Sequence, residues 1–426
     1  MKKKVYIKNI AWLLADKGIN IFGGLLVGVW VARYLGPTDY GVLNYAIAFA
    51  AFFSFFSRLG LNEIVVRELS KKPEKQHEII STAFFMKLFG SVVAVILIMF
   101  ILFLTNSGDK VLLVATFFIA LGYIVKSLDV VDYYYQAKVL SKYVVVSRNI
   151  AYLITISLQV FFILKEFSVE YFALASFFMF VIYLKREKGI KKWTFNKQLA
   201  KKLFKYSWPL MISTFLILIH MRVDQVMIGA FLGKAELGIY SVSVRLVELW
   251  YIIPTLLVST LMPYFIRIRE INKKLYNLRL VQFYSIMFWM GIFVGVGALL
   301  FGQQLIILLY GEAYQGAYKA LVFNIWAIIF VSQALARSIW IIAENHQKYR
   351  LYNNIIAVIV NIVLNIVLIP KMGISGAAIA TFLTQFLGTW LFTLLFKPIR
   401  KSTFSLMKSV YPGFLFVSKK KIKNIT

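Results

Sequence analysis

The stretch RYLGPTDYGVLNYA, residues 33–46, lies between two long apolar segments and carries a Leu-Gly pair, then an acid, then a second Gly. A weaker copy, FLGKAELGIYSVS, occupies residues 231–243. The alignment of the two copies pairs Gly36 with Gly233, Asp39 with Glu236 and Gly41 with Gly238. The same frame in the same place in both halves predicts an internal repeat. Internal repeats in a membrane chain are typical of transporters.

The composition predicts an all-α polytopic membrane protein. The chain has 426 residues, is 60% hydrophobic and contains only 18 acidic residues. Its charges gather in short stretches between apolar segments of roughly 18 to 25 residues, the length that crosses a bilayer as a helix. It contains no cysteine, which excludes disulfides and thiol chemistry. No Gly-rich phosphate loop, metal-ligand spacing or nucleophile motif occurs, so we predict no enzyme activity, cofactor or metal.

The apolar segments predict about twelve spans in two halves. Those of the first half are residues 10–34, 41–59, 79–104, 111–131, 143–164 and 169–184, and those of the second are residues 207–232, 238–262, 280–301, 318–343, 351–369 and 374–396. We therefore expect a six-helix lobe over residues 1–184, a basic linker over 185–206, a second six-helix lobe over 207–396 and a basic interfacial tail over 397–426. An even number of spans in each half implies a pseudo-two-fold axis along the membrane normal.

The formal net charge of +30 is distributed over alternate loops. This pattern follows the positive-inside rule and places both termini in the cytoplasm. It indicates anionic lipid at the cytoplasmic face as a partner, rather than nucleic acid.

Basic residues inside the predicted spans are the candidate substrate-binding residues, because ionisable groups in a membrane usually face a bundle interior or water. They come from both halves: Lys17, Lys126, Arg222, Arg245 and Arg337. Facing one cavity between the halves, they would form a cationic path for a substrate with an anionic head, since guanidinium and ammonium groups match phosphate oxygens. An equally weighted alternative makes Lys126–Asp129 and Arg245–Glu248 locally satisfied pairs. The position of Lys87, about two turns into its span, leaves its role open.

Three further residues are candidates for coupling transport to protons: Asp16, His220 and Asp224. Histidine titrates near physiological pH, which suits such a role. The alternative for His220 and Asp224, which are four residues apart, is a mutually satisfied polar pair.

Two motifs resemble the multidrug/oligosaccharidyl-lipid/polysaccharide exporter superfamily: ARYLGPTDYGVLNYA after the first span, and GISGAAIAT at residues 373–381, which opens the last span. With its cationic interior, the chain most resembles a bacterial polysaccharide repeat-unit flippase of the O-antigen or capsule type. The resemblance implies a fold like that of the multidrug and toxin extrusion (MATE) transporters. It also implies transport of undecaprenyl-pyrophosphate-linked oligosaccharide to the outer leaflet of the bacterial cell (inner) membrane by alternating access. Lipopolysaccharide, capsule or exopolysaccharide synthesis would be the pathway, with a polysaccharide polymerase or assembly proteins as partners.

Three alternatives stay open. A drug/cation antiporter of the multidrug and toxin extrusion type needs acids for cationic drugs, whereas bases match or outnumber acids in these spans. A peptidoglycan-precursor flippase is expected to have two more spans at its C-terminus. A membrane enzyme that polymerises or ligates saccharide is expected to have a larger outer loop.

The opening stretch itself is predicted to be structural. Gly36 and Pro37 stop the first span at the outer face, and Gly41 restarts the second span with a close turn. The second copy repeats this turn between Gly233 and Gly238.

Overall fold

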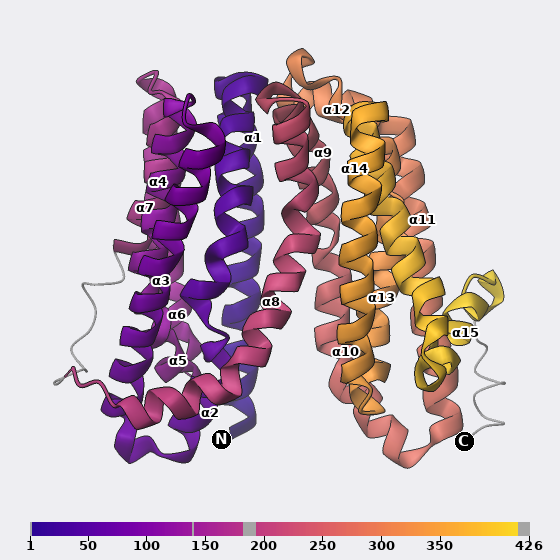
Figure 1. Ribbon diagram of the computed structural model, residues 1–426. Helices are drawn as coiled ribbons and strands as arrows, with labels where there is room; N and C mark the ends of the chain where they lie inside the picture. The colour runs from indigo at the N-terminus through magenta and orange to yellow at the C-terminus, as the bar shows by residue number, and fades with distance from the viewer. Residues whose placement is uncertain (1, 139, 182–192, 416–426) are drawn as a thin grey trace. The chain divides into compact units, whose positions relative to one another are not determined.

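The computed structural model describes residues 2–138, 140–181 and 193–415, and within these ranges it describes all side chains except those of residues 2–22, 141, 143 and 176–181. The described residues form helices joined by short turns, without a β-strand. The chain divides into two compact units, Met1–Val226 and Met227–Thr426 (Figure 1). The predicted linker lies partly outside the described residues.

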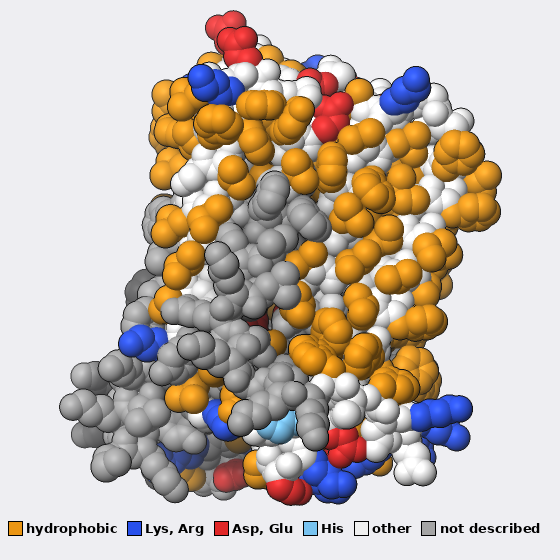
Figure 2. Space-filling view, turned by 90° about the vertical axis from the view of Figure 1, so that its left-hand side faces the viewer, with side chains coloured by type: hydrophobic (Ala, Val, Ile, Leu, Met, Phe, Trp, Pro, Cys, Tyr) orange, Lys and Arg blue, Asp and Glu red, His pale blue; other side chains and the backbone are white. Residues whose placement is uncertain are grey.

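The helices confirm a multi-pass membrane protein. In the described part of the chain, eight helices are long and apolar enough to cross a membrane, or nine if a bent pair forms one span. Figure 2 shows one face of the molecule, where hydrophobic side chains cover the middle and charged ones gather at both ends. Two of the eight helices are broken at a glycine, Gly36 or Gly373. The count of twelve spans stays a prediction.

The first unit is built around α1. Its helices are α1 (Lys2–Arg58), α2 (Leu61–Lys71), α3 (Gln76–Asn106), α4 (Lys110–Val125), α5 (Val130–Ala137), α6 (Ser141–Leu164), α7 (Val169–Val181) and most of α8 (Lys197–Phe231). Helix α1 packs against α3, α4 and α6, and α4 also packs against α7. The short helix α2 is amphipathic: Leu61, Val65 and Leu69 are buried against α5 and the start of α3.

The second unit has an aromatic core. Its helices are α9 (Lys234–Trp250), α10 (Ile252–Ile271), α11 (Lys273–Tyr310), α12 (Ala317–Asn324), α13 (Ala327–Ala343), α14 (Gln347–Phe386) and α15 (Arg400–Lys408). Helix α11 packs against α13, and α12 packs against α9 and α14. The core contains Tyr276, Tyr284 and Trp340. Leu406 of α15 is buried in the same core, so this part of the predicted basic tail is packed on the bundle.

The two copies of the repeat have the same backbone turn. Gly36 has φ 68° and ψ 174°, and Gly233 has φ 92° and ψ 174°. This region of backbone space is essentially restricted to glycine. A Cβ at either position would have no neighbour within 4 Å, so the backbone angle alone requires glycine there.

The helices restart earlier than the sequence indicated. The residues after Gly36 are already helical from Pro37, and α9 begins at Lys234. Proline is suited to the first helical position because its φ is fixed and its missing N–H has no intrahelical partner there. Gly41 and Gly238 are therefore buried residues inside helices rather than parts of the turns.

Candidate functional site: buried charges within the helices

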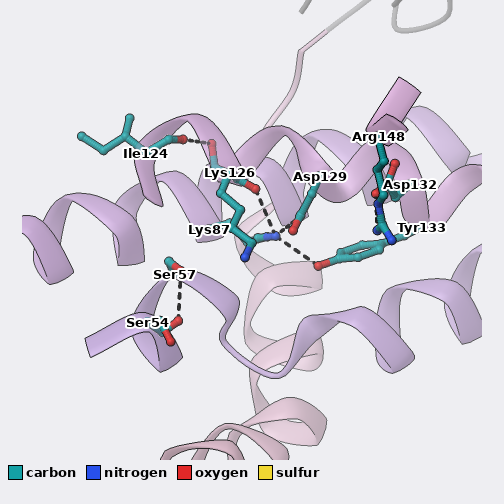
Figure 3. A network of polar contacts seen from close by, with 10 residues as sticks. Ser54, Ser57, Lys87, Ile124, Lys126, Asp129, Asp132, Tyr133 and Arg148 are labelled. Carbon is teal, nitrogen blue, oxygen red and sulfur yellow. Dashed lines mark hydrogen bonds and ion pairs between the residues drawn. The ribbon is translucent and has the colours of Figure 1, made fainter. Parts of the chain in front are cut away.

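A buried ion pair joins α3 to a break between α4 and α5. Lys87 of α3 is only 1% exposed, and its ammonium group forms a salt bridge with Asp129 (Figure 3). The same group donates to the Tyr133 hydroxyl at 3.1 Å and to the Lys126 carbonyl at 3.5 Å. The ammonium group also lies 5.1 Å from the centre of the Tyr133 ring. All the protons of this buried cation therefore face an acceptor or a ring.

The break that holds these partners is a 3₁₀ turn, η2 (Lys126–Asp129), which separates α4 from α5. A 3₁₀ turn inside a helical span changes the hydrogen-bond pattern, and the affected carbonyls need other donors inside a membrane. Lys87 supplies a donor to one of these carbonyls and a counter-charge to the carboxylate that ends the turn. The cation and the helix break therefore stabilise each other.

A second ion pair ties the following helix to α6. Asp132 of α5 is buried and accepts a hydrogen bond from Arg148 of α6 at 2.7 Å. Asp129 and Asp132 thus hold one short helix to two neighbouring helices. Tyr133, which follows Asp132 in α5, adds a second contact to Lys87 through its hydroxyl group.

The structure adds a partner for Asp129 that the sequence did not indicate. Asp129 forms its salt bridge with Lys87, which lies on a different helix. The available signal was that Asp129 and Tyr133 are four residues apart, so they share a helix face. Nothing in the sequence shows that α3 is the helix packed against that face.

In the second unit, Arg337 lies in the interior of α13. It is 4% exposed, and its Nη1 donates to the Thr389 carbonyl at 2.8 Å. Thr389 belongs to the π-helical turn η5 (Leu387–Leu391), which follows α14. π-helical turns inside helices are frequent at functional sites. Among the described residues, Arg337 forms no ion pair and its Nε has no hydrogen-bond partner.

Polar side chains surround this arginine on the same face of α13. Gln333 is fully buried, donates to the Ser409 hydroxyl at 3.1 Å and accepts from the Trp390 indole N–H at 2.8 Å. Ser409 directly follows α15, so the C-terminal helix closes one side of this polar cluster. Buried polar groups of this kind stabilise a fold only when their hydrogen bonds are formed.

The predicted substrate-binding residues lie in both units. Lys126 and Arg222 belong to the first unit, and Arg245 and Arg337 belong to the second. Lys126, Arg222 and Arg245 are half-buried, whereas Arg337 is enclosed. The side chain of Lys17 lies outside those that the structure describes. A common cationic path therefore stays a prediction.

The coupling role of Asp16, His220 and Asp224 stays a prediction. Asp224 is buried near the end of α8 and its carboxylate accepts the backbone N–H of Gln225 at 2.8 Å. His220 is half-buried on the same helix, and the side chain of Asp16 is not among those described. Within the described residues, no group of three His, Cys, Asp or Glu side chains is placed to hold a metal ion.

A further ion pair lies at the end of α13, outside the predicted spans. Glu344 follows the last residue of that helix and accepts two hydrogen bonds from Arg269, at 2.8 and 3.1 Å. The hydrogen bonds from Arg269 hold the pKa of the Glu344 carboxyl below its usual value. This pair fixes the end of α13 to α10.

An all-helical, multi-pass chain with ion pairs inside its apolar helices has the architecture of a membrane transporter. The family model described as "Polysaccharide biosynthesis protein" matches residues 6–269, more than half of the chain. The protein belongs to this family.

Individual relatives agree with this assignment. The capsular polysaccharide biosynthesis protein CapF of Staphylococcus aureus is 22% identical over 397 residues, which cover 89% of this chain and 96% of CapF. Among solved structures, an inward-facing multidrug resistance MATE transporter of the MOP superfamily matches with a TM-score of 0.66 and 15% identity, over 95% of this chain and all of the other. The lipid II flippase MurJ, in an inward closed conformation, matches with a TM-score of 0.64 and 17% identity, over 95% and 91% of the two chains. The chain therefore has the fold of the MOP superfamily.

Proposed function

We propose that the protein is a flippase that moves undecaprenyl-pyrophosphate-linked oligosaccharide repeat units from the cytoplasmic to the outer leaflet of a bacterial cell membrane. Alternating access would carry the transport, and both chain termini would lie in the cytoplasm. The products would feed O-antigen, capsule or exopolysaccharide synthesis, with a polysaccharide polymerase as the next protein to act.

The observation that carries this proposal is the match to CapF, a capsular polysaccharide biosynthesis protein, over nearly the full length of both chains. The fold is that of transporters, one of which is by its name a lipid II flippase. A transporter fold in a polysaccharide family supports movement of a lipid-linked intermediate. It gives no support to a polymerising or ligating enzyme.

The charges within the helices support an anionic substrate group. Arg222 and Arg245 are half-buried rather than enclosed, and one comes from each unit. We assign these two the first role in holding the diphosphate, with Lys126 and Lys17 as further contacts. Arg337 is enclosed, so its contact with substrate requires an opening of the polar cluster around Gln333.

Complementation tests this function. The gene is expressed in a strain that lacks its own repeat-unit flippase, and surface polysaccharide is measured. We expect restored polymer, and we expect flux of a fluorescent lipid-linked oligosaccharide in vesicles that contain the purified protein. No restoration at a normal membrane level, together with efflux of cationic drugs from a sensitive host, would assign the protein to drug antiport instead. A pH gradient across the vesicles tests the coupling role of Asp16, His220 and Asp224, and flux that is insensitive to it excludes proton coupling.

A further inference from the structure

The segment over residues 193–208, which leads into α8 and forms its first turns, is fixed to one end of the first unit (Figure 1). The Ser81 hydroxyl of α3 donates to the Thr194 carbonyl at 2.6 Å. The Asn196 backbone N–H donates to the Thr82 hydroxyl at 3.2 Å, and its side chain accepts the Leu199 N–H at 3.0 Å. The first turn of α8 is therefore capped and held against the start of α3.

Helix α2 fixes the next two turns of α8. Lys202 forms a 2.8 Å salt bridge with Glu68, and the Arg67 guanidinium lies 5.1 Å from the centre of the Tyr206 ring. Leu203 is fully buried with the apolar face of α2. A Cβ at Gly60 would lie 2.6 Å from the Ser207 carbonyl oxygen, so the absence of a side chain at Gly60 lets the two backbones approach. The segment is thus a rigid part of the unit surface.

The opposite face of this segment carries cations without acids. Lys197, Lys201, Lys205 and Trp208 follow one another at intervals of four, four and three residues, which places them on one helix face. All four are exposed, and Trp208 is 50% exposed. Among the described residues, none of the three lysines forms an ion pair, whereas their neighbour Lys202 is neutralised by Glu68. Exposed Phe204 and Tyr206 lie beside this stripe.

The length of α8 places the stripe at the level of lipid headgroups. Pro209 lies inside α8, and the first turns bend away from the rest of the helix (Figure 1). The part after this bend, residues 209–231, is about 34 Å long at about 1.5 Å per residue. The hydrocarbon core of a bilayer is about 30 Å thick. The first turns of α8 therefore extend beyond the hydrocarbon core, and lysine beside tryptophan is the side-chain combination enriched at that depth.

We propose that the Lys197, Lys201, Lys205 and Trp208 face is a binding site for the phosphate headgroup of anionic phospholipid, independent of the transported substrate. The three ammonium groups bind the phosphate, and Trp208 lies among the glycerol and upper acyl carbons. An indole exposed at the end of a membrane span favours lipid over a water-soluble polyanion, because tryptophan is enriched at the membrane–water interface. Because contacts with α2 and α3 hold this segment in place, the site has a defined position on the unit surface.

The test uses the full-length protein in a zwitterionic detergent, titrated with phosphatidylglycerol, phosphatidylcholine or inorganic phosphate, with native mass spectrometry and thermal unfolding as readouts. We expect bound phosphatidylglycerol and a raised unfolding temperature, with little effect of phosphatidylcholine. Replacement of Lys197, Lys201 and Lys205 by Gln weakens phosphatidylglycerol binding by about tenfold or more, because each lysine near a lipid surface contributes substantially. Equal stabilisation by inorganic phosphate would identify a free-anion site and overturn the lipid assignment.

The matched control replaces Lys71, Lys72 and Lys75 by Gln. These exposed lysines lie at the end of α2 and in the following 3₁₀ turn, so the same charge is lost at the same end of the unit. We expect this variant to bind phosphatidylglycerol within about twofold of the unaltered protein, because these lysines belong to other elements and not to the face of Lys197, Lys201, Lys205 and Trp208. Equal weakening by both triple variants would show a diffuse surface potential and overturn a defined site.

A second readout does not depend on the lysine variants. Phosphatidylglycerol with bromine on its upper acyl carbons quenches nearby tryptophan fluorescence. We expect Trp208→Phe to remove more of the quenched signal than Trp340→Phe, because Trp340 is buried in the core of the second unit. Equal losses would overturn the placement of Trp208 in the lipid. Surface polysaccharide complementation by the lysine variant separates this site from transport, since failure of lipid binding leaves the flippase proposal untouched.

Discussion

Lys87 and Asp129 form an ion pair across two helices, but the two partners differ in exposure: Lys87 is 1% exposed and the Asp129 side chain 24%. Removal of either partner therefore has unequal consequences. Without Asp129, the lysine loses its salt-bridge partner in an enclosed site, whereas the carboxylate without Lys87 remains partly exposed. The pair thus predicts an asymmetry that a pair of equal exposure would not show.

We expect Asp129→Asn to destabilise the protein by about 3–5 kcal/mol, because it leaves a buried ammonium group uncompensated. Lys87→Met is expected to cost clearly less. The double variant Lys87→Met with Asp129→Asn is expected to recover most of the loss, since neither charge then remains. Unfolding of the purified variants in one detergent gives the double-mutant cycle. Equal costs for the two single variants would contradict the assigned exposures.

Replacement of Gly36, the first glycine of the repeat, is expected to lower stability through the backbone angles alone. Gly36→Ala is expected to cost about 1–3 kcal/mol, because alanine does not tolerate φ 68° with ψ 174°. Space plays no part, since a Cβ there meets no atom within 4 Å. Gly28 is the matched control in the same helix: it also has no such neighbour but has no positive φ. Gly28→Ala should therefore be neutral or stabilising.

Unfolding temperatures of the two alanine variants decide this prediction. We expect Gly233→Ala to behave like Gly36→Ala, because the two turns share their backbone angles. A harmless Gly36→Ala in a correctly inserted protein would show that the turn at this position relaxes without strain.

Features that depend on residues adjacent in the chain could be predicted from the sequence. Contacts between helices that are distant in the chain could not. The Gly36 and Gly233 turns follow from residues adjacent in the chain, and composition alone gave the membrane class. The pairing of Lys87 with Asp129 depends on the packing of α3 against the η2 break, which no local pattern encodes. The burial of Leu406 was missed for the same reason, because α15 is short, basic and only partly apolar.

The ion pair between Arg269 and Glu344 predicts a pH dependence of stability. Its hydrogen bonds lower the pKa of Glu344 in the folded protein. The stabilisation is therefore present above the pKa of the unfolded chain, about 4.3, and is lost as the pH falls through the lower, folded-state value. We expect Glu344→Gln to be less stable than the unaltered protein at pH 7, and the difference to shrink as the pH falls below about 4. Both side chains are partly exposed, so the effect is small and decreases with salt.

Thermal unfolding at pH 3 to 7 in low salt measures this difference. Glu63→Gln is the control, because Glu63 is exposed on α2 and forms no ion pair among the described residues. A constant difference between unaltered protein and Glu344→Gln across this range would contradict the linkage.

Half-buried Arg222 and enclosed Arg337 should respond differently to substitution when both protein stability and transport are measured. Arg222→Ala is expected to abolish most flux in vesicles while the membrane level stays normal, because we assign Arg222 to the substrate site and its side chain is only half-buried. Lys110→Ala, at the exposed start of α4, serves as the control for loss of one positive charge. Unchanged flux for Arg222→Ala would remove this residue from the substrate site.

For Arg337, we expect substitution to affect both the unfolding temperature and transport. Arg337 is 4% exposed and has no carboxylate partner among the described residues, so burial of its guanidinium costs several kcal/mol of desolvation. The hydrogen bond to the Thr389 carbonyl returns only about 1.5–3 kcal/mol. Arg337→Met, of similar length, should therefore keep or raise the unfolding temperature. If the charge serves transport, the same variant loses flux, and Arg337→Lys recovers little because a point charge does not reproduce the guanidinium geometry. A drop in stability with normal flux per molecule would instead make Arg337 a support for the η5 turn.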